Sequence, residues 1–376
     1  MENVRLGVIG ATGGIAEVHQ SYFADIPGLE HAAVCARTPD ALDAVAQKYG
    51  AKAWTDGEAL IRSGRIDAVF IACPHTEHPK YCHAAFEHGV HVLCEKPIAV
   101  SALEAEEVNL AYQAARKIHP KLIFAAMFNR RTDSKWSEIK HCIDGGRLGE
   151  IVRVSWTITS WFRTQAYYES SDWRATWAGE GGGVLINQCS HNLDLLWWMV
   201  GMPSRVTARA SLGKYHQIEV EDEVAAILEW PNGAMGTFVT TTGQSPGINR
   251  LEIVGTRGTA IADAQCDEDY RVYLSDSSVQ EFIMSDDRYS AQPEFEISQI
   301  KSRSSEYSSH ERVTRNFIET IRSAGTQDQL IAPGCEGIHG LEIGNAILMS
   351  GLSGESVRLP MDRKKYDQFL HGLHAH

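Results

Sequence analysis

The chain has 376 residues, of which 43% are hydrophobic and 22% are charged, so it is long enough for two domains with cores of their own. Its 35 basic and 48 acidic side chains give a net charge of −13, and without a long basic run this argues against nucleic acid as a partner. The apolar runs are shorter than the roughly 18 residues that a membrane span needs, which argues against a membrane partner.

The compartment is predicted from the start of the chain and from its cysteines. The first apolar run begins almost at Met1, which leaves no room for a signal peptide, so we expect a soluble cytoplasmic protein. None of the eight cysteines forms a CxxC pair, and most lie in apolar segments. This pattern favours reduced thiols over a disulfide framework, and we expect no metal site.

The first part of the chain alternates short apolar runs with helical patterns. The apolar runs are residues 6–10, 32–36, 68–73, 91–94 and 122–128. Such alternation predicts βαβ units, that is, a Rossmann-type doubly wound parallel sheet, and we assign residues 1–128 to this domain. Thr38 is predicted to cap a helix that has Pro39 at its first position, and Ser101 and Glu104 form a capping box.

The rest of the chain, residues 129–376, has a different pattern. A short helix around Trp136 precedes several strand-like runs, with hairpin signals at 231–233 and 255–258. Two helices, around 313–321 and 338–352, are expected to finish the chain. We predict an α/β domain with a large, mostly antiparallel, open-faced sheet built from runs at 151–161, 205–212, 224–230, 234–242, 250–254, 259–263 and 271–274.

A glycine loop follows the first predicted strand. Gly10, Gly13 and Ala16 have the spacing G-x-x-G-x-x-A and precede a helix, as in loops that let the backbone approach a pyrophosphate. The next strand ends at Ala36 and Arg37, where NAD sites usually place a carboxylate. The absence of that carboxylate permits NADP without excluding NAD, although Arg37 could equally be a solvated surface residue.

The segment 89–100 reads as a buried strand that ends in Glu95, Lys96 and Pro97. In open parallel sheets ligands bind at the carboxyl ends of the strands, where a partly desolvated lysine can exchange protons with a substrate hydroxyl. Glu95 can pair with Lys96 or with the cofactor, and a cis bond before Pro97 is plausible. The alternative is a strand end whose charged residues face water.

Residues 181–198 read as one largely apolar helix. Asn187, His191 and Asp194 would then share a face, and His191 is the better candidate for a base because an amide and a carboxylate accompany it. The preceding stretch is rich in aromatic residues and arginine. Its aromatic rings could contact a sugar, and Arg163 and Arg174 could bind an anionic group. Alternatively, the rings could pack inside the protein and the arginines could pair with Glu169, Asp172 or Glu180. The rings are those of Trp161, Tyr167, Tyr168, Trp173 and Trp177.

These motifs together resemble the glucose–fructose oxidoreductase / inositol dehydrogenase (Gfo/Idh/MocA) family over almost the whole chain. The matching segments are the glycine loop, CPHTEH at 73–78, GVHVLCEKP at 89–97, FNRR at 128–131, GGRLGEI at 145–151, GGGVLINQCSHNLD at 181–194 and RLEIVGTRGT at 250–259. The glycine loop has one residue more than the common family form. Asn187 stands where many members carry aspartate, so it cannot tune the His191 pKa with a full charge.

The resemblance implies the site residues. Lys96 and His191 would be the catalytic pair, with His191 as base, Lys96 as proton relay and Asn187 beside them. NAD or NADP would contact Gly10, Thr12, Gly13, Gly14, Ile15, Ala36, Arg37, Cys73, Pro74, His75, His78, Glu95, Lys96 and Pro97. The substrate would contact Arg130, Trp161, Arg163, Tyr168, Trp173, Arg174, Asn187 and His191. A homodimer or homotetramer is expected from the open sheet.

Three functions remain open at this point. The first is a dehydrogenase that passes a hydride from a sugar ring hydroxyl to NAD(P). The second is a redox-neutral NAD-dependent glycosidase acting on an anionic glycoside such as a sulfoquinovoside; it needs a further base, for which Tyr167, Tyr168 and His75 are candidates. The third is a non-catalytic nucleotide-sensing regulator, against which the presence of Lys96 and His191 argues.

Overall fold

The computed structural model describes residues 3–263, 270–285, 292–300 and 305–373. The chain forms two compact units, of which the first comprises residues 1–132, 178–181 and 306–341 and the second comprises residues 133–177, 182–305 and 342–376. Residues 306–341 therefore belong to the first unit, although they follow most of the second along the chain.

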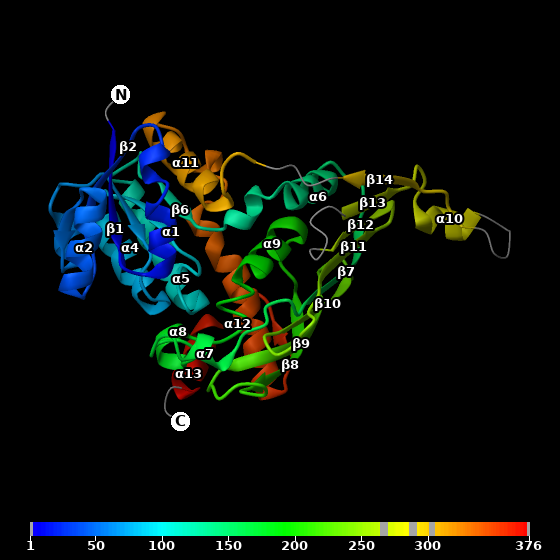
Figure 1. The fold of residues 1–376 in the computed structure, drawn as a ribbon. Coiled ribbons are helices and arrows are strands. Elements are labelled where there is room, and N and C mark those ends of the chain that lie inside the picture. Colours follow the sequence, from blue (N-terminus) through cyan, green and yellow to red (C-terminus); the bar gives the residue numbers. More distant parts are fainter. Residues whose placement is uncertain (1–2, 264–269, 286–291, 301–304, 374–376) are drawn as a thin grey trace. The chain divides into compact units, whose positions relative to one another are not determined.

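The first unit contains a six-stranded sheet in which all neighbouring strands are parallel (Figure 1). Its order, β3-β2-β1-β4-β5-β6, is that of a Rossmann fold, which confirms the predicted fold class. The three-residue β3 was missed because so short a run shows no apolar pattern. The strands are β1 (Val4–Ile9), β2 (Leu29–Cys35), β3 (Lys52–Trp54), β4 (Ala68–Ile71), β5 (His91–Cys94) and β6 (Phe124–Ala126).

The helices of this unit begin close to where the sequence places them. Ser101 caps its helix through the predicted capping box with Glu104. Thr38 occupies the N-cap position before Pro39, but its side chain makes no capping hydrogen bond, so that part of the prediction is wrong. The helices are α1 (Gly14–Gln20), α2 (Pro39–Tyr49), α3 (Gly57–Arg62), α4 (His78–Glu87), α5 (Ala102–Arg116) and α11 (Ser309–Arg322).

Helix α11 contributes to the core of the first unit. Its side chains Phe317 and Ile318 are buried in the same cluster as Leu6 and Val8 of β1 and Phe70 of β4. Burial of apolar surface at about 25 cal/mol per Å² is the main stabilising contribution of such contacts. This packing explains why a helix so late in the chain belongs to the Rossmann unit.

The second unit contains a nine-stranded sheet of order β14-β13-β12-β11-β7-β10-β9-β8-β15. Only the pair β10 and β7 is parallel among the described strands, so the predicted, mostly antiparallel sheet is confirmed, as are the hairpins at 231–233 and 255–258. The strands are β7 (Ile151–Ile158), β8 (Arg205–Leu212), β9 (Glu221–Glu229), β10 (Met235–Thr241), β11 (Asn249–Gly255), β12 (Gly258–Asp263), β13 (Tyr270–Leu274), β14 (Glu296–Ile300) and β15 (Val357–Arg358).

The two faces of this sheet differ. On one face Trp136 of α6 packs against Trp156 of β7, with ring centroids 5.5 Å apart. The opposite face is open, because Val152, Ile227 and Met235 are 44%, 48% and 56% exposed. The remaining helices are α6 (Ser134–Asp144), α7 (Gln165–Tyr168), α8 (Trp177–Glu180), α9 (Ser190–Val200), α10 (Val279–Ser285), α12 (Gly337–Ser353) and α13 (Arg363–Leu373); the boundary between the units falls within α12.

The expectation that two helices finish the chain is wrong, because α13 follows α12. Most of its residues are polar, and only Tyr366 and Leu370 are buried, which leaves a weak helical pattern in the sequence. No helix in the described part of the chain is both long and apolar enough to cross a membrane. The seven cysteines that the structure describes are all free thiols, whereas Cys266 lies outside the described residues.

Candidate active site

The glycine loop lies between β1 and α1, where the strand order of the Rossmann sheet reverses. Gly10 has a φ of +84°, and a Cβ at this position would lie 2.6 Å from the carbonyl oxygen of Ala72. A Cβ on Gly14, by contrast, would meet no atom within 4 Å among the described residues outside its own helix and its chain neighbours. Thr12 and Ile15 are exposed. The loop backbone is therefore accessible to a ligand, which fits the pyrophosphate of a dinucleotide at a switch point.

The end of β2 is tied to this loop. The carbonyl oxygen of Cys35 accepts hydrogen bonds from the backbone N–H groups of Gly10 and Ala11, at 2.9 and 3.1 Å. Ala36, which follows, is buried, and Arg37 is exposed. The guanidinium of Arg37 has no ion-pair partner among the described residues, so it is available to an anionic group beside the loop.

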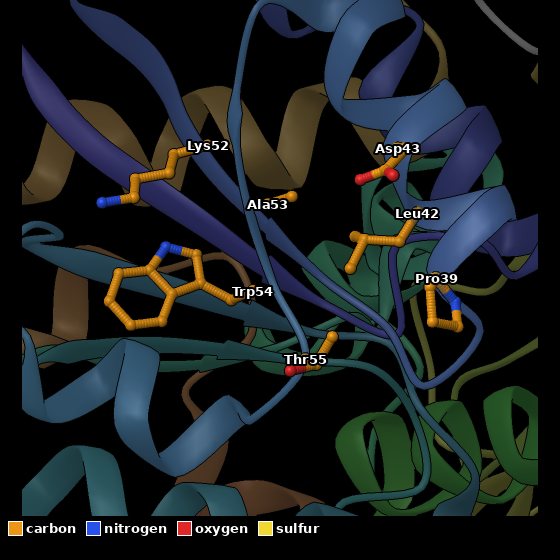
Figure 2. A pocket seen from close by; sticks show the side chains of 7 residues that line it. All are labelled: Pro39, Leu42, Asp43, Lys52, Ala53, Trp54 and Thr55. Atoms are coloured by element: carbon orange, nitrogen blue, oxygen red, sulfur yellow. The ribbon is translucent and has the colours of Figure 1, made fainter.

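A pocket of about 330 Å³ lies at the start of α2, two residues beyond Arg37 (Figure 2). Pro39, Leu42 and Asp43 come from α2, and the other lining residues come from β3 and the residue after it. The ammonium of Lys52 lies 5.2 Å from the centre of the Trp54 ring. This pocket was not predicted, because it depends on the short strand that the sequence pattern misses.

His78 connects the loops that follow β4 and β5. Its Nδ1 lies 2.7 Å from the carbonyl oxygen of Pro97, and its Nε2 lies 2.9 Å from that of Cys73. The ring is fully buried, and burial lowers its pKa, so the neutral ring donates one of these two hydrogen bonds. His75, which begins a turn of 3₁₀ helix (His75–Glu77) before α4, is also buried. The predicted cofactor residues from both strand ends are thus brought together.

Glu95 is buried at the end of β5 and has partners that the sequence did not reveal. One carboxylate oxygen lies 3.1 Å from Nε2 of His19, and the other accepts a hydrogen bond from the backbone N–H of Lys96 at 3.0 Å. Burial alone would raise the pKa of Glu95, but the hydrogen bond and charge of His19 outweigh it and lower the pKa. The Lys96–Pro97 bond is cis, and Lys96 is half-buried.

His19 belongs to a buried polar chain in the first unit. Its Nδ1 hydrogen-bonds the hydroxyl of Tyr22, which lies 3.2 Å from the hydroxyl of Thr314 in α11. The ring of His310 packs edge-on against His19, and burial lowers the pKa of His310 to about 4. A histidine in the helix directly after a glycine loop is the sequence signal that could have identified His19.

In the second unit, the predicted long helix over 181–198 is wrong. Helix α9 begins at Ser190, and the residues before it form turns. Glu221 of β9 holds these turns, because its carboxylate accepts hydrogen bonds from the N–H groups of Gly183 at 2.9 Å and Leu185 at 3.0 Å. A Cβ on Gly183 would lie 2.1 Å from the Glu221 carbonyl oxygen. The glycines allow a close approach to a strand instead of starting a helix.

His191 and Asn187 are therefore held by different elements. His191 is the second residue of α9 and is half-buried, whereas Asn187 lies in the turns before α9. The side-chain amide of Asn187 donates to the hydroxyl oxygen of Tyr167 at 3.4 Å. Asp194, on α9, is 1% exposed. The helical spacing used to group these three residues thus applies only to His191 and Asp194.

Two arginines flank the Tyr167 ring. The guanidinium carbons of Arg163 and Arg174 each lie 4.7 Å from its centre, and they also stack on Trp161 and Trp173, respectively. The hydroxyl oxygen of Tyr167 accepts hydrogen bonds from Arg174 at 2.9 Å and from Gln188 at 3.2 Å. We call Trp161, Arg163, Tyr167, Trp173 and Arg174 the arginine–aromatic cluster.

The positive charge of this cluster has no counter-charge in ion-pair contact among the described residues. Among the residues that the structure describes, neither Arg163 nor Arg174 forms an ion pair, so pairing with Glu169, Asp172 or Glu180 is not found. The Nε–H groups of both arginines and the indole N–H of Trp161 are buried and have no acceptor within the described ranges. Buried donors without partners are costly, and an anionic ligand would satisfy them.

Other predicted contact residues lie elsewhere. Tyr168 is 6% exposed and its hydroxyl donates to Thr242 at 2.9 Å, and Trp177 is 3% exposed, so both pack inside the protein. Arg130 is exposed on a 3₁₀ turn of the first unit. Its neighbour Arg131 is buried and forms an ion pair with Glu336 at 2.5 Å.

Comparisons with known proteins agree with this architecture. Residues 4–122 match the family model of oxidoreductases with an NAD-binding Rossmann fold, and residues 136–261 match that of the GFO/IDH/MocA C-terminal domain. The chain is 28% identical to D-glucoside 3-dehydrogenase of Escherichia coli, over 62% of this chain and 68% of the relative. It is 29% identical to inositol 2-dehydrogenase of Rhizobium meliloti, over 70% of this chain and 76% of the relative.

Among solved structures, the WlbA dehydrogenase of Bordetella pertussis in complex with NADH and UDP-GlcNAcA is similar to this chain. The two share 26% identity and superpose with a TM-score of 0.77, over 96% of this chain and 100% of the other. The glycine loop, the Rossmann strand order and both family models agree, and the first unit is an NAD-binding domain. The chain belongs to the GFO/IDH/MocA family of NAD-binding oxidoreductases.

Proposed function

We propose that the protein oxidises a ring hydroxyl of an anionic sugar derivative. The observation that carries the proposal is the arginine–aromatic cluster, in which Arg163 and Arg174 have no carboxylate partner among the described residues. Flat aromatic rings favour sugar rings, and guanidinium groups favour carboxylate, sulfonate or phosphate groups. The relatives named above act on a glucoside and an inositol, and WlbA was crystallised with a nucleotide sugar, UDP-GlcNAcA.

The catalytic roles follow from the chemistry of the side chains. His191 accepts the proton of the substrate hydroxyl, and Lys96 orients that hydroxyl and passes the proton on. Asn187 hydrogen-bonds the substrate; its contact with Tyr167 supports this role, because it links Asn187 to the arginine–aromatic cluster. When NAD(P) is bound, its nicotinamide ring accepts the hydride.

The choice between NAD and NADP depends on the end of β2. An exposed Arg37 without an ion-pair partner among the described residues supports use of NADP, because it can pair with a 2′-phosphate. The test compares the KM values for NAD and NADP in the wild type and in Arg37→Asp. The substitution should raise the KM for NADP by at least tenfold and leave that for NAD nearly unchanged.

A redox-neutral glycosidase is the second candidate. Its elimination step needs an additional base, and Tyr167 is the favoured candidate of the three, because its hydroxyl oxygen accepts hydrogen bonds from Arg174, Gln188 and Asn187. Tyr168 donates its own hydroxyl hydrogen to Thr242 in the protein interior, which disfavours it. His75 is buried in the first unit.

One experiment separates the two functions. The protein is incubated with NAD or NADP and with matched pairs of neutral and anionic substrates, namely glucose with glucuronate and 4-nitrophenyl glucoside with 4-nitrophenyl glucuronide. Growth of reduced-nicotinamide absorbance with glucuronate supports the dehydrogenase, whereas nitrophenol release without net reduction supports the glycosidase. Equal turnover of neutral and anionic substrates would contradict the assignment of the arginine–aromatic cluster.

Variants of the proposed catalytic and substrate-binding residues provide the controls. Lys96→Met and His191→Ala should each lower kcat by at least a hundredfold. Arg174→Met should raise the KM for glucuronate about tenfold and change that for glucose little, because a hydrogen-bonded charge contributes roughly 1.5–3 kcal/mol. If all three variants keep wild-type kinetics, the site assignment is wrong.

We also propose that the protein forms a homodimer or homotetramer through the open face of its nine-stranded sheet. The exposed side chains of Val152, Ile227 and Met235 on neighbouring strands support this proposal. Light scattering after gel filtration gives the mass, and Ile227→Lys should reduce it to that of one chain. An unchanged mass would place any interface elsewhere.

A further inference from the structure

The carboxylate of Asp222 is hydrogen-bonded by four groups of the second unit. It is fully buried near the start of β9 and accepts hydrogen bonds from the backbone N–H groups of Lys214, Tyr215 and His216, at 2.9, 2.8 and 3.2 Å. Its neighbour Glu221 holds the turns before α9. Adjacent residues of one strand therefore hold two different segments of the candidate site.

The fourth partner of Asp222 is the ring of His216. Nδ1 of this ring lies 3.0 Å from the Asp222 carboxylate, and Nε2 lies 3.0 Å from the carbonyl oxygen of Arg163. Both contacted atoms are oxygens, and the ring bridges them. The ring of Tyr168 packs edge-on against His216, with centroids 4.9 Å apart, which limits its rotation.

The backbone of Arg163 is fixed on both sides. Its carbonyl oxygen meets His216, and its N–H donates to the carbonyl oxygen of Thr242 at 2.9 Å. The N–H of Thr242 in turn donates to the backbone carbonyl oxygen of Asp222 at 3.0 Å. These contacts hold the backbone of Arg163, while its guanidinium contacts Trp161 and Tyr167 and donates to the Phe162 carbonyl oxygen.

We infer that His216, fixed by Asp222, is a positioning residue for Arg163 and thereby for selection of an anionic substrate; this inference rests on the proposed function. Neither residue belongs to the arginine–aromatic cluster itself, so neither contacts the anion. The effect arises because an ion pair with a planar guanidinium depends strongly on geometry. A displaced Arg163 backbone would move the guanidinium away from its stacked position on Tyr167.

Two substitutions separate the two ends of the bridge. In His216→Gln the side-chain amide can reach the position of Nε2 and keep the hydrogen bond to Arg163. In His216→Asn the shorter amide takes the position of Nδ1, keeps the contact with Asp222 and loses Arg163. Both variants remove the imidazole ring and both keep one hydrogen bond, so they are matched for general effects on folding.

The first measurement is hydrogen–deuterium exchange of the full chain over peptides covering 161–168. Exchange of this segment should be about fivefold faster in His216→Asn than in the wild type and close to wild type in His216→Gln, in line with the loss of one hydrogen bond. Equal exchange in the two variants overturns the positioning role, whatever the protein catalyses.

The second measurement is the KM for glucuronate and for glucose in the same three proteins. His216→Asn should raise the KM for glucuronate about fivefold without a comparable change in kcat or in the KM for glucose, and His216→Gln should restore it. Faster exchange with an unchanged KM for glucuronate overturns the link to substrate selection. If the wild type turns over no sugar, the proposed function fails, and the exchange result still decides the positioning role.

Discussion

Nε2 of His19 and a carboxylate oxygen of Glu95 lie 3.1 Å apart in the interior of the first unit. One residue comes from α1, directly after the glycine loop, and the other comes from the end of β5, directly before Lys96. This hydrogen bond joins the segment expected to hold the pyrophosphate to the segment expected to act on the substrate. It also provides a hydrogen-bond partner for a carboxylate that is only 6% exposed.

Removal of the imidazole should therefore destabilise the protein. We expect His19→Leu to lower the free energy of unfolding by about 3 kcal/mol at pH 7, because it leaves a buried carboxylate without its partner. In His19→Gln the side-chain amide can still reach Glu95, so the loss of unfolding free energy should be less than half of that in His19→Leu. Urea unfolding measures both, and equal losses in the two variants would contradict this account of Glu95.

The His19–Glu95 pair should also make the free energy of unfolding depend on pH. The pKa of Glu95 is lowered in the folded wild type, so the stability it contributes is present above the unfolded pKa and is lost as pH falls through the folded pKa. In His19→Leu the effect of burial on the Glu95 carboxyl is no longer opposed by His19. The pKa of Glu95 should therefore be higher in the folded variant than in its unfolded chain. The stability difference between wild type and variant should therefore narrow from pH 7 to pH 4.

Gly10 and Gly14 offer a matched comparison within one loop. Ala at position 10 would have to adopt a φ of +84° with its Cβ 2.6 Å from the Ala72 carbonyl oxygen, whereas Ala at position 14 meets no atom within 4 Å. Gly10→Ala should lose about 2–4 kcal/mol of unfolding free energy. Gly14→Ala should be neutral or gain up to about 1 kcal/mol, since it begins a helix. Thermal unfolding without cofactor measures the stability of both variants. Similar losses of unfolding free energy in both would mean that the close approach of Gly10 to Ala72 does not explain the need for glycine there.

Glu221 and Glu223 provide a comparison on one strand. The buried Glu221 accepts hydrogen bonds from backbone N–H groups on both carboxylate oxygens. Glu221→Gln replaces one of these acceptor oxygens with an NH2 donor that faces another donor, and should cost about 2–4 kcal/mol. Glu223 pairs with the half-exposed Lys214, and Glu223→Gln should cost less than about 1 kcal/mol. Chemical denaturation of both variants is the measurement. A small loss for Glu221→Gln would show that the turns before α9 do not need this carboxylate.

The buried His91 should make the folded protein less stable in mild acid. Burial lowers the pKa of His91 to about 4, and its Nδ1 accepts the backbone N–H of Ile123 at 3.0 Å, so the folded protein holds it neutral. The unfolded chain protonates it below about pH 6.5, and stability therefore falls as pH drops from 6.5 towards 4. This residue should account for about 3 kcal/mol of that fall.

The test of this prediction uses His91→Asn, whose side-chain oxygen can still accept from Ile123 but does not titrate. The variant should show a flatter decline of unfolding free energy between pH 6.5 and 4. His88→Asn, at an exposed position three residues earlier, should keep the wild-type slope. If the two variants have the same slope, His91 is not the titrating group.

Local patterns predicted much of the fold. The capping box at Ser101, the hairpin at 231–233 and the alternation of strands and helices in the first unit depend on residues close in sequence, and all are present. The three-residue β3 and the polar α13 were missed because short or weakly amphipathic elements are stabilised mainly by the neighbours against which they pack.

Contacts between distant residues account for the misplaced start of α9. The apolar run over 181–198 has helical character, but the Glu221 carboxylate binds the N–H groups of Gly183 and Leu185 from 38 and 36 residues away. These hydrogen bonds replace those of a helix, and no short-range pattern encodes them. The candidate site is affected directly, because Asn187 lies in turns and meets Tyr167 instead of sharing a helical face with His191.

The sequence by itself determined the parallel Rossmann sheet, the glycine loop at its switch point and the residue types of the candidate site, because these follow from local periodicity and from side-chain chemistry. Only the tertiary structure decided which polar groups meet: that His19 hydrogen-bonds Glu95, and that Arg163 and Arg174 stack on Tyr167 with no carboxylate partner among the described residues. Charge compensation and desolvation depend on distances through space, and the folded chain sets those distances by packing segments that are far apart in sequence.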